Sequence, residues 1–275
     1  MIPRRAVGGS WWGEFEFKPR ETRYWQLGPF SLWVQRTPAE FRVTTGSGVD
    51  LDQTALRVGE TWSESIPEGH ELVRYSVGEA EQGLEIVPLM ADRSIIVKSD
   101  TTFIVPPGRT VMAYVSSPLW MRAQLLEPKR VLHEEPMLRP SDTWWGPSTL
   151  EGELCYAIRT SVRYDLDNLP LRPHRAVSAV WVVNQAKTPL QLDRIRLPIP
   201  NLSLFSDTNG RLWTEAVTLV RGQDDDLASV RLEKSPPVEA GPCAKVVGPR
   251  FEPEKNLLIR AFAGLLGQRK DRGWF

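Results

Sequence analysis

The sequence predicts a mainly β protein, with two sandwich-like domains in tandem followed by a C-terminal amphipathic helix. Three observations support this fold class. Apolar and polar residues alternate in short segments, turn residues recur roughly every eight to twelve positions, and 23 of the 275 residues are proline. Proline interrupts helices because it lacks an amide hydrogen and collides with the preceding turn. Long helices are therefore not expected before the last segment of the chain.

The first β-domain is predicted over residues 1–134. In 14–18, Phe15 and Phe17 face one side of a strand while the charged residues around them face the other. Residues 46–83 contain six glycines and few apolar runs, which indicates an insertion within this domain. Further strands are expected at 22–27, 30–36, 41–45, 72–77, 84–90, 93–98, 101–105, 109–116, 119–126 and 130–134.

Residues 135–152 are predicted as a linker that contains a Trp-rich loop, because this segment is rich in Pro, Ser, Thr and Gly. The second β-domain is expected over 153–252 and begins with a strand at 153–163. Its 176–183 segment is almost continuously apolar, as in a central strand that is buried on both faces.

Three local features of the sequence predict a particular turn, a β-bulge and a β-hairpin. Pro106-Pro107-Gly108 predicts a turn, because proline presets φ and glycine tolerates a positive φ. The apolar positions of 189–197 change parity near Asp193, which indicates a β-bulge. Residues 211–221 and 227–232 have the pattern of a β-hairpin.

The C-terminal segment 253–270 changes period. Its apolar residues recur at spacings of one and four, which places them on one stripe of a helix, with a proline at its start and a glycine near its end. The helix either packs on its own domain or binds a partner. The candidate partner contacts are Leu258, Phe262 and Leu265.

Two short motifs occur twice. Trp-Trp-Gly lies at 11–13 and 144–146, and a Gly-Glu pair, at 13–14 and 152–153, leads the next strand in both places. Pro-Leu-x-x-Asp-Arg lies at 88–93 and 189–194. The pairs suggest two related β-domains if 46–83 is an insertion in the first. Coincidence in a chain with 11 tryptophans is the alternative.

Charge and composition argue against two classes of protein, those that bind nucleic acid and those that insert into a membrane. The chain has 34 basic and 34 acidic residues, so its formal net charge is 34 − 34 = 0. Proteins that bind nucleic acid through its phosphates usually carry a basic excess, so no nucleic-acid partner is expected. No apolar stretch approaches the roughly 20 residues of a membrane-spanning helix, and the N-terminal residues lack the apolar core of a signal peptide. We therefore expect a cytoplasmic protein without direct membrane insertion.

No metal and no cofactor are predicted. Cys155 and Cys243 form no CxxC pair and are expected to be reduced, buried thiols. The three histidines, His70, His133 and His174, share no metal-binding spacing. The sequence contains no phosphate-binding loop and no nucleophile elbow. An enzyme is therefore not the favoured interpretation, although carboxylates that pair only in space stay compatible with the sequence.

The densest group of chemically useful residues surrounds the second Trp-Trp-Gly. Two adjacent tryptophans in a loop, beside an acid and a hydroxyl, can form an aromatic platform for a sugar, a peptide proline or a partner's side chain. Alternatively, one indole fills the core between the domains and the other covers it, since tryptophan is mostly buried. The candidate ligand-binding residues are Asp142, Thr143, Trp144, Trp145, Glu153 and Tyr156.

Several of these segments together resemble a known family. Trp11-Trp12-Gly13, the turn at 106–108 with the segment 114–120, and 142–146 before 152–156 are similar to the prokaryotic family called domain of unknown function 432. The resemblance covers most of the chain and implies no catalytic residues. At most it implies a membrane-protein partner, a small-conductance mechanosensitive channel.

Two functional hypotheses follow. The first is a non-enzymatic interaction or regulatory protein, favoured by tandem β-domains without a catalytic motif. The second is a carbohydrate-binding or carbohydrate-active protein that uses the Trp-rich loop. A pocket lined by Trp144 or Trp145 with two facing carboxylates would favour the second, whereas an exposed apolar patch on a sheet edge or on the helix would favour the first. A homodimer formed through edge strands or the tail helix is compatible with both.

Overall fold

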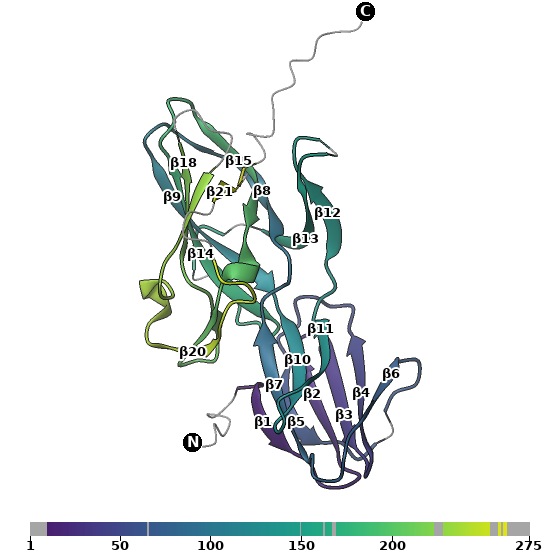
Figure 1. Ribbon diagram of the computed structural model, residues 1–275. Coiled ribbons are helices and arrows are strands. Elements are labelled where there is room, and N and C mark those ends of the chain that lie inside the picture. Colours follow the sequence, from purple (N-terminus) through teal and green to yellow (C-terminus); the bar gives the residue numbers. More distant parts are fainter. Residues whose placement is uncertain are drawn as a thin grey trace, which may run out of the picture.

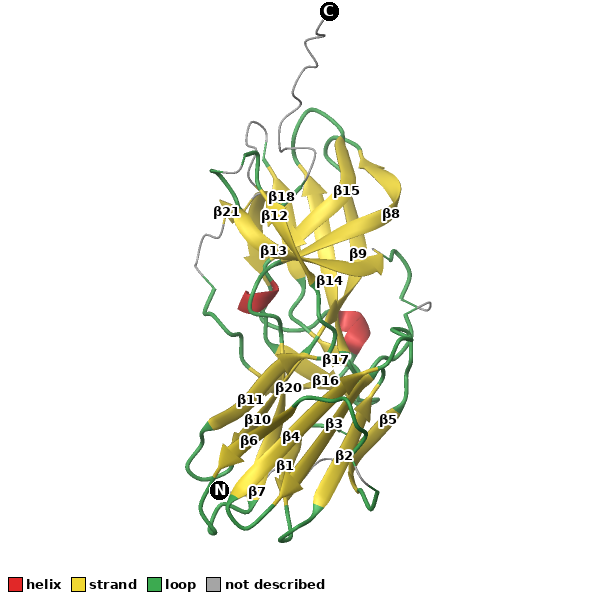
Figure 2. Ribbon diagram, turned by 90° about the vertical axis from the view of Figure 1, so that its right-hand side faces the viewer, coloured by secondary structure: helices red, strands yellow, loops and turns green. Residues whose placement is uncertain are grey.

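The computed structural model confirms that the chain is mainly β. It describes residues 10–64, 66–148, 150–161, 163–166, 169–222, 228–253, 258–259 and 261–262. Figure 1 shows two lobes joined end to end, with the N-terminal strands in one of them. The helices of the described part are two short 3-10 turns, η1 (Ile199–Asn201) and η2 (Val238–Ala240), and Figure 2 shows both near the junction of the lobes.

Two antiparallel sheets form the first lobe, with strand orders β1-β7-β10-β11 and β5-β2-β3-β4-β6. In β10, Met121, Ala123 and Leu125 are buried while Arg122 and Gln124 between them are partly exposed, so alternation builds the inner face of this sheet. The strands span Gly13–Glu16 (β1), Thr22–Leu27 (β2), Phe30–Arg36 (β3), Glu40–Ser47 (β4), Leu56–Thr61 (β5), Leu72–Ser76 (β6), Gly83–Leu89 (β7), Trp120–Leu125 (β10) and Val131–Pro136 (β11).

The second lobe also has two sheets. One has the order β12-β13-β8-β15, and the other has the order β20-β16-β17-β14-β18-β19-β21, with β9 paired to β14. The strands span Ile95–Val105 (β8), Thr110–Pro118 (β9), Ser141–Trp145 (β12), Glu153–Ser161 (β13), Arg175–Asn184 (β14), Leu190–Leu197 (β15), Leu204–Asp207 (β16), Leu212–Trp213 (β17), Val217–Arg221 (β18), Ala228–Leu232 (β19), Cys243–Val247 (β20) and Leu258–Ile259 (β21).

The chain passes between the lobes three times. Strands β8 and β9 precede residue 135, yet they pair with β13, β15 and β14 of the second lobe. The chain then returns to the first lobe for β10 and β11, which extend the sheet of β7. Strands β5 and β6, which lie within the predicted insertion at 46–83, complete the other sheet of that lobe. The predicted domain boundaries stay a prediction, but no single point in the sequence separates the strands of one lobe from the strands of the other.

The specific local predictions are confirmed. Strand β14 is buried over most of its length and pairs with strands on both sides. The β8–β15 register shifts between Leu192 and Arg194, where the bulge was predicted. Gly108 has a φ of 68° in the turn that connects β8 to β9, and β18 and β19 form the predicted hairpin. These features are encoded locally, which is why the sequence pattern contains them.

The predicted C-terminal helix over 253–270 is wrong for the residues that the structure describes. Leu258–Ile259 form β21, which pairs with β19, and Phe262 forms a β-bridge with Ile195. Ala261 and Phe262 are fully buried. Pairing with an open sheet edge and burial in the core outweigh a modest helix propensity. Within the predicted helix, residues 254–257, 260 and 263–270 lie outside the described part.

Candidate functional site

The predicted Trp-rich loop contains an edge strand. Ser141–Trp145 form β12, which pairs antiparallel with β13 at the edge of its sheet. Successive strand residues face opposite sides, so Trp144 and Trp145 cannot share one platform. Trp144 is 48% exposed, whereas Trp145 is 4% exposed. One indole therefore fills a core and the other faces outward.

The outer face of the β12–β13 hairpin carries an apolar pair. Trp144 lies directly opposite Leu154 in the strand register, and Leu154 is 45% exposed. The indole Nε1 of Trp144 donates a hydrogen bond to the carbonyl oxygen of Ser148 at 2.8 Å, which restrains the ring. Leu150, in the connecting turn, is almost fully exposed. We call Trp144, Leu150 and Leu154 the hairpin patch.

A charged cluster continues the same face beyond the hairpin patch. Arg93 Nη1 lies 3.0 Å from Asp142 Oδ1, and the guanidinium lies 5.1 Å from the centroid of the Tyr156 ring. The Tyr156 hydroxyl donates a hydrogen bond to Asp92 Oδ1 at 3.0 Å. Burial and the hydrogen bond to Asp92 raise the pKa of Tyr156, so the phenol stays protonated at neutral pH. These groups satisfy one another, which suits recognition better than proton transfer.

The inner face of the hairpin forms a small core. Trp145 and Cys155 pack with Ile96, and burial raises the pKa of the Cys155 thiol to about 11. Glu153 forms a two-point ion pair with Arg196. The six predicted site residues therefore divide between the faces, with Asp142, Trp144 and Tyr156 outside and Thr143, Trp145 and Glu153 inside.

The predicted partner contacts in the tail do not gather on a described surface. Leu258 lies in β21, opposite Ser229 of β19. Phe262 is fully buried and contributes to the main core. Leu265 lies outside the described residues.

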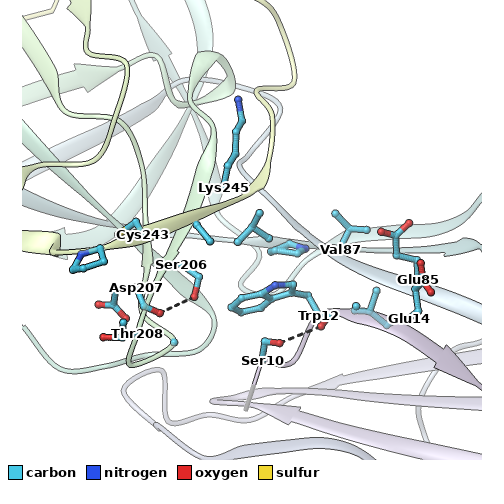
Figure 3. Close-up of a pocket in the computed structure, with 17 residues that line it drawn as sticks. Ser10, Trp12, Glu14, Glu85, Val87, Ser206, Asp207, Thr208, Cys243 and Lys245 are labelled. Carbon is cyan, nitrogen blue, oxygen red and sulfur yellow. Dashed lines mark hydrogen bonds between the residues drawn. The ribbon is translucent and has the colours of Figure 1, made fainter. Parts of the chain in front are cut away.

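A groove between the lobes is a second candidate site. Its volume is about 560 Å³, within the usual range of roughly 300–1,000 Å³ for small-molecule sites. One wall is the outer face of β1 and β7, and the other is formed by β20 and the β16–β17 turn. Figure 3 shows Trp12 in the middle, with Glu14 and Glu85 on one side and Asp207 and Thr208 on the other.

The first Trp-Trp-Gly positions this groove. Trp11 is buried, and its Nε1 donates a hydrogen bond to the carbonyl oxygen of Pro173 in the other lobe at 3.0 Å. The Trp12 ring meets Trp11 edge to face, with centroids 5.5 Å apart. No site was predicted from the sequence at this motif. Its paired tryptophans are a signal that could have indicated one, but no local pattern shows that β7 and β20 would join it.

An ion pair joins the segment after β20 to the first lobe beside the groove. Arg250, which follows β20, places Nη1 2.6 Å from Glu134 Oε1 of β11. Arg122 of β10 places Nη2 2.7 Å from Glu134 Oε2. Arg250 also donates a hydrogen bond to the carbonyl oxygen of Met90. These partly buried contacts fix β20 across the outer face of the first lobe.

The polar groups at the β20 end of the groove suit binding rather than covalent chemistry. Asp207 accepts hydrogen bonds from the backbone N–H groups of Asn209 and Arg211 and from Trp213 Nε1, at 2.8, 2.9 and 3.1 Å. Burial and the neighbouring Asp207 raise the pKa of the Cys243 thiol. A thiol with a raised pKa is a poor nucleophile at neutral pH.

Two further features are absent from the part of the chain that the structure describes. Among its residues, no group of three or more His, Cys, Asp or Glu side chains is arranged to hold a metal ion. In the same part of the chain, no helix is long and apolar enough to cross a membrane.

Residues 11–266 match the model of the family described as "Protein of unknown function (DUF432)". The match covers both lobes, and therefore both the hairpin patch and the groove. No curated protein and no solved structure shows significant similarity to the chain.

Proposed function

The chain belongs to the DUF432 family, whose description names no activity, and we propose that it is a non-enzymatic interaction protein that binds a partner protein through the hairpin patch. One observation carries the proposal: Trp144 and Leu154 stand opposite each other on an edge hairpin, each about half exposed. The finer architecture that we propose is two sandwich-like lobes, the second of which presents this hairpin.

The composition of the hairpin patch suits a protein interface. Tryptophan is enriched at interface hot spots, where a large ring is buried and its N–H keeps a partner. Trp144 already has that hydrogen-bond partner in the hairpin, so binding would bury the ring without stranding the N–H. Leu154, directly opposite Trp144, extends the apolar area, and Leu150 is exposed in the turn that joins the two strands. Removing this area from water stabilises a complex by roughly 25 cal/mol per Å² before the costs of association.

The edge position of β12 suggests the mode of binding. Among the described strands, none pairs with β12 on the side away from β13. An extended segment can add to such an edge through backbone hydrogen bonds, with side-chain pockets giving specificity. We propose that the partner places an apolar side chain on Trp144 and a polar one near Arg93 and Asp142.

The family resemblance suggests where to look for the partner. We propose a cytoplasmic protein that contacts a membrane protein, and a mechanosensitive channel is the first candidate. A second copy of this chain, paired through β12, would cover the same patch and is the other partner to test.

Affinity purification of the tagged full chain from native cells, with solubilised membranes and mass spectrometry, tests this function. A variant with Trp144→Ser and Leu154→Ser removes the patch, and Trp181→Ser is the matched control. Trp181 is 39% exposed on β14 of the other sheet. We expect one protein to co-purify with the wild type and the Trp181→Ser control and to be lost from the double variant. Retention of that protein by the double variant would contradict the proposal.

The carbohydrate alternative has weaker support from this geometry. A pocket lined by Trp144 or Trp145, with two carboxylates facing each other, would have favoured this alternative. Trp145 is buried, and neither residue lines the groove between the lobes.

A further inference from the structure

We propose that the groove between the lobes binds an aliphatic polyamine, with its methylene chain along Trp12 and its ammonium groups at the two acidic ends. This inference concerns a different surface from the hairpin patch and does not depend on the proposed function. Three features carry it: an apolar middle, two carboxylates at one end, and a third carboxylate at the other.

The middle of the groove is apolar. Trp12 lies partly exposed between the walls, beside Val87 of β7. The facing wall contributes Pro242, Ala244 and Val246. Methylene groups gain free energy when they leave water for such a surface, and the face of an indole also attracts ammonium groups. A chain of methylene groups between cations fits both properties.

Two carboxylates crowd one end. Glu14 and Glu85 are directly opposite in the β1–β7 register, an unfavourable arrangement for like charges. Lys129 Nζ lies 3.0 Å from Glu85 Oε2, and Gln124 donates a hydrogen bond to the same oxygen at 2.7 Å. Glu14 is exposed and forms no ion pair with any residue that the structure describes. A bound ammonium group would supply the missing positive charge.

Asp207 provides the second acidic end. Its three hydrogen-bond donors, two backbone N–H groups and an indole N–H, are all neutral. A carboxylate has about four acceptor sites, so roughly one stays open for a ligand. Thr208 adds a hydroxyl beside it, and Figure 3 shows both residues across Trp12 from Glu14 and Glu85. The acidic groups are thus separated by the apolar middle.

The net charge of the lining favours a cation over other ligand classes. Three acidic residues and one basic residue line the groove, which gives 1 − 3 = −2, and Lys129, which pairs with Glu85 from outside the lining, leaves −2 + 1 = −1. The basic residue, Lys245, points away from Trp12 in Figure 3, and its Nζ lies 6.0 Å from the centroid of the Phe205 ring. An anion would meet repulsion here, and a metal ion would leave the apolar walls unused. Sugar hydroxyls can donate hydrogen bonds to the carboxylates but leave their negative charge unbalanced, so the salt dependence of binding separates a polyamine from a sugar.

Isothermal titration calorimetry of the full chain with spermidine tests the proposal. We expect one saturable site whose affinity falls as NaCl is added, because salt screens these charges. Glu14→Gln should weaken binding about tenfold, the effect of losing one charge-assisted hydrogen bond. Glu16→Gln is the matched control and should bind like the wild type, because Glu16 is exposed on the same strand but does not line the groove.

A series of α,ω-diamines of increasing length adds a geometric test. We expect an optimum length, since both ammonium groups must reach carboxylates, and weaker binding by the monoamine of that length. No saturable binding of spermidine would overturn the proposal, as would equal affinity for the wild type and a folded Glu14→Gln variant. Equally tight binding of an uncharged diol would also overturn it. Binding of oligolysine without binding of spermidine would overturn it and assign the groove to a basic peptide.

Discussion

The two Trp-Trp-Gly segments share a sequence but orient their tryptophans in opposite orders. In the first, Trp11 is buried and Trp12 faces the groove between the lobes. In the second, Trp144 faces outward and Trp145 is buried. Each segment therefore gives the molecule one core ring and one surface ring. The sheet around each segment, rather than the tripeptide itself, therefore selects which ring is buried.

Strand pairing also separates the two segments. Strand β1, which follows the first, pairs antiparallel with β7, which carries the first Pro-Leu motif. Strand β13, which follows the second, pairs in parallel with β8, and β8 separates it from β15. The strand after Trp-Trp-Gly therefore pairs with the strand that carries the Pro-Leu motif in the first lobe, but not in the second. Short repeated motifs here do not correspond to a repeated arrangement of strands.

The largest effect is expected from the buried ring of the first segment. Trp11→Ala removes a core ring and its hydrogen bond to Pro173, which links the lobes. We expect the free energy of unfolding to fall by about 3–5 kcal/mol, measured by urea denaturation. Trp11→Phe should recover part of this loss. A loss below about 1 kcal/mol would contradict the core position of Trp11, because surface substitutions have effects of that size or less.

The buried ring of the second segment should contribute less. Trp145 packs in a small cluster with Ile96 and Cys155 at the side of the second lobe. Such a site relaxes more easily than the main core, so Trp145→Ala should cost about 3 kcal/mol, the low end for a buried tryptophan. Urea denaturation beside the Trp11→Ala variant ranks the two. A larger loss for Trp145→Ala than for Trp11→Ala would show that the small hairpin core contributes more to stability than the main core around Trp11.

The free energy of unfolding should also depend on pH through His174, which follows the Pro173 carbonyl that accepts the Trp11 hydrogen bond. Burial, together with the nearby positive charges of Arg175 and Arg172, lowers the pKa of His174 from 6.5 to about 3. Between these values the unfolded chain binds a proton that the folded chain does not, so stability falls as the pH falls from 6.5 toward 3. We expect His174→Gln to flatten this dependence by up to about 1.4 kcal/mol per pH unit. Parallel pH dependences in urea denaturation of the two proteins would refute this assignment.

The smallest effect is expected at the exposed ring of the second segment. Trp144 is 48% exposed, so Trp144→Ala should change the free energy of unfolding by about 0.5 kcal/mol or less. Thermal unfolding beside the wild type measures the difference. A clear fall in melting temperature would mean that Trp144 supports the fold, and the contrast with Trp145 would be lost.

The sequence contained most local features of the fold. Alternation and turn residues predicted β14, the bulge near Asp193 and the turn at Gly108, because neighbouring residues determine them. The lobe that each strand joins depends on distant pairing, so the placement of β8 and β9 was not predictable. At the end of the chain, pairing with β19 decided the conformation of Leu258–Ile259 against a helical spacing.

The same distinction applies to the candidate sites. Alternation within Ser141–Trp145 already requires that Trp144 and Trp145 face opposite sides, but the surrounding prolines and glycines concealed the strand. The groove combines Trp12, Glu85 and Asp207 from three distant segments. No spacing in the sequence relates these residues, so only the assembled sheets show the site.

We propose that the outward-facing Trp144 ring of β12 is a binding surface. Photocrosslinking in native cells tests it most directly, with p-benzoylphenylalanine replacing Trp144 in the full chain and, as a control, replacing Trp181 on the other sheet. We expect one discrete crosslinked product from position 144 and none from position 181. No product from position 144, or the same product from both positions, would contradict the claim.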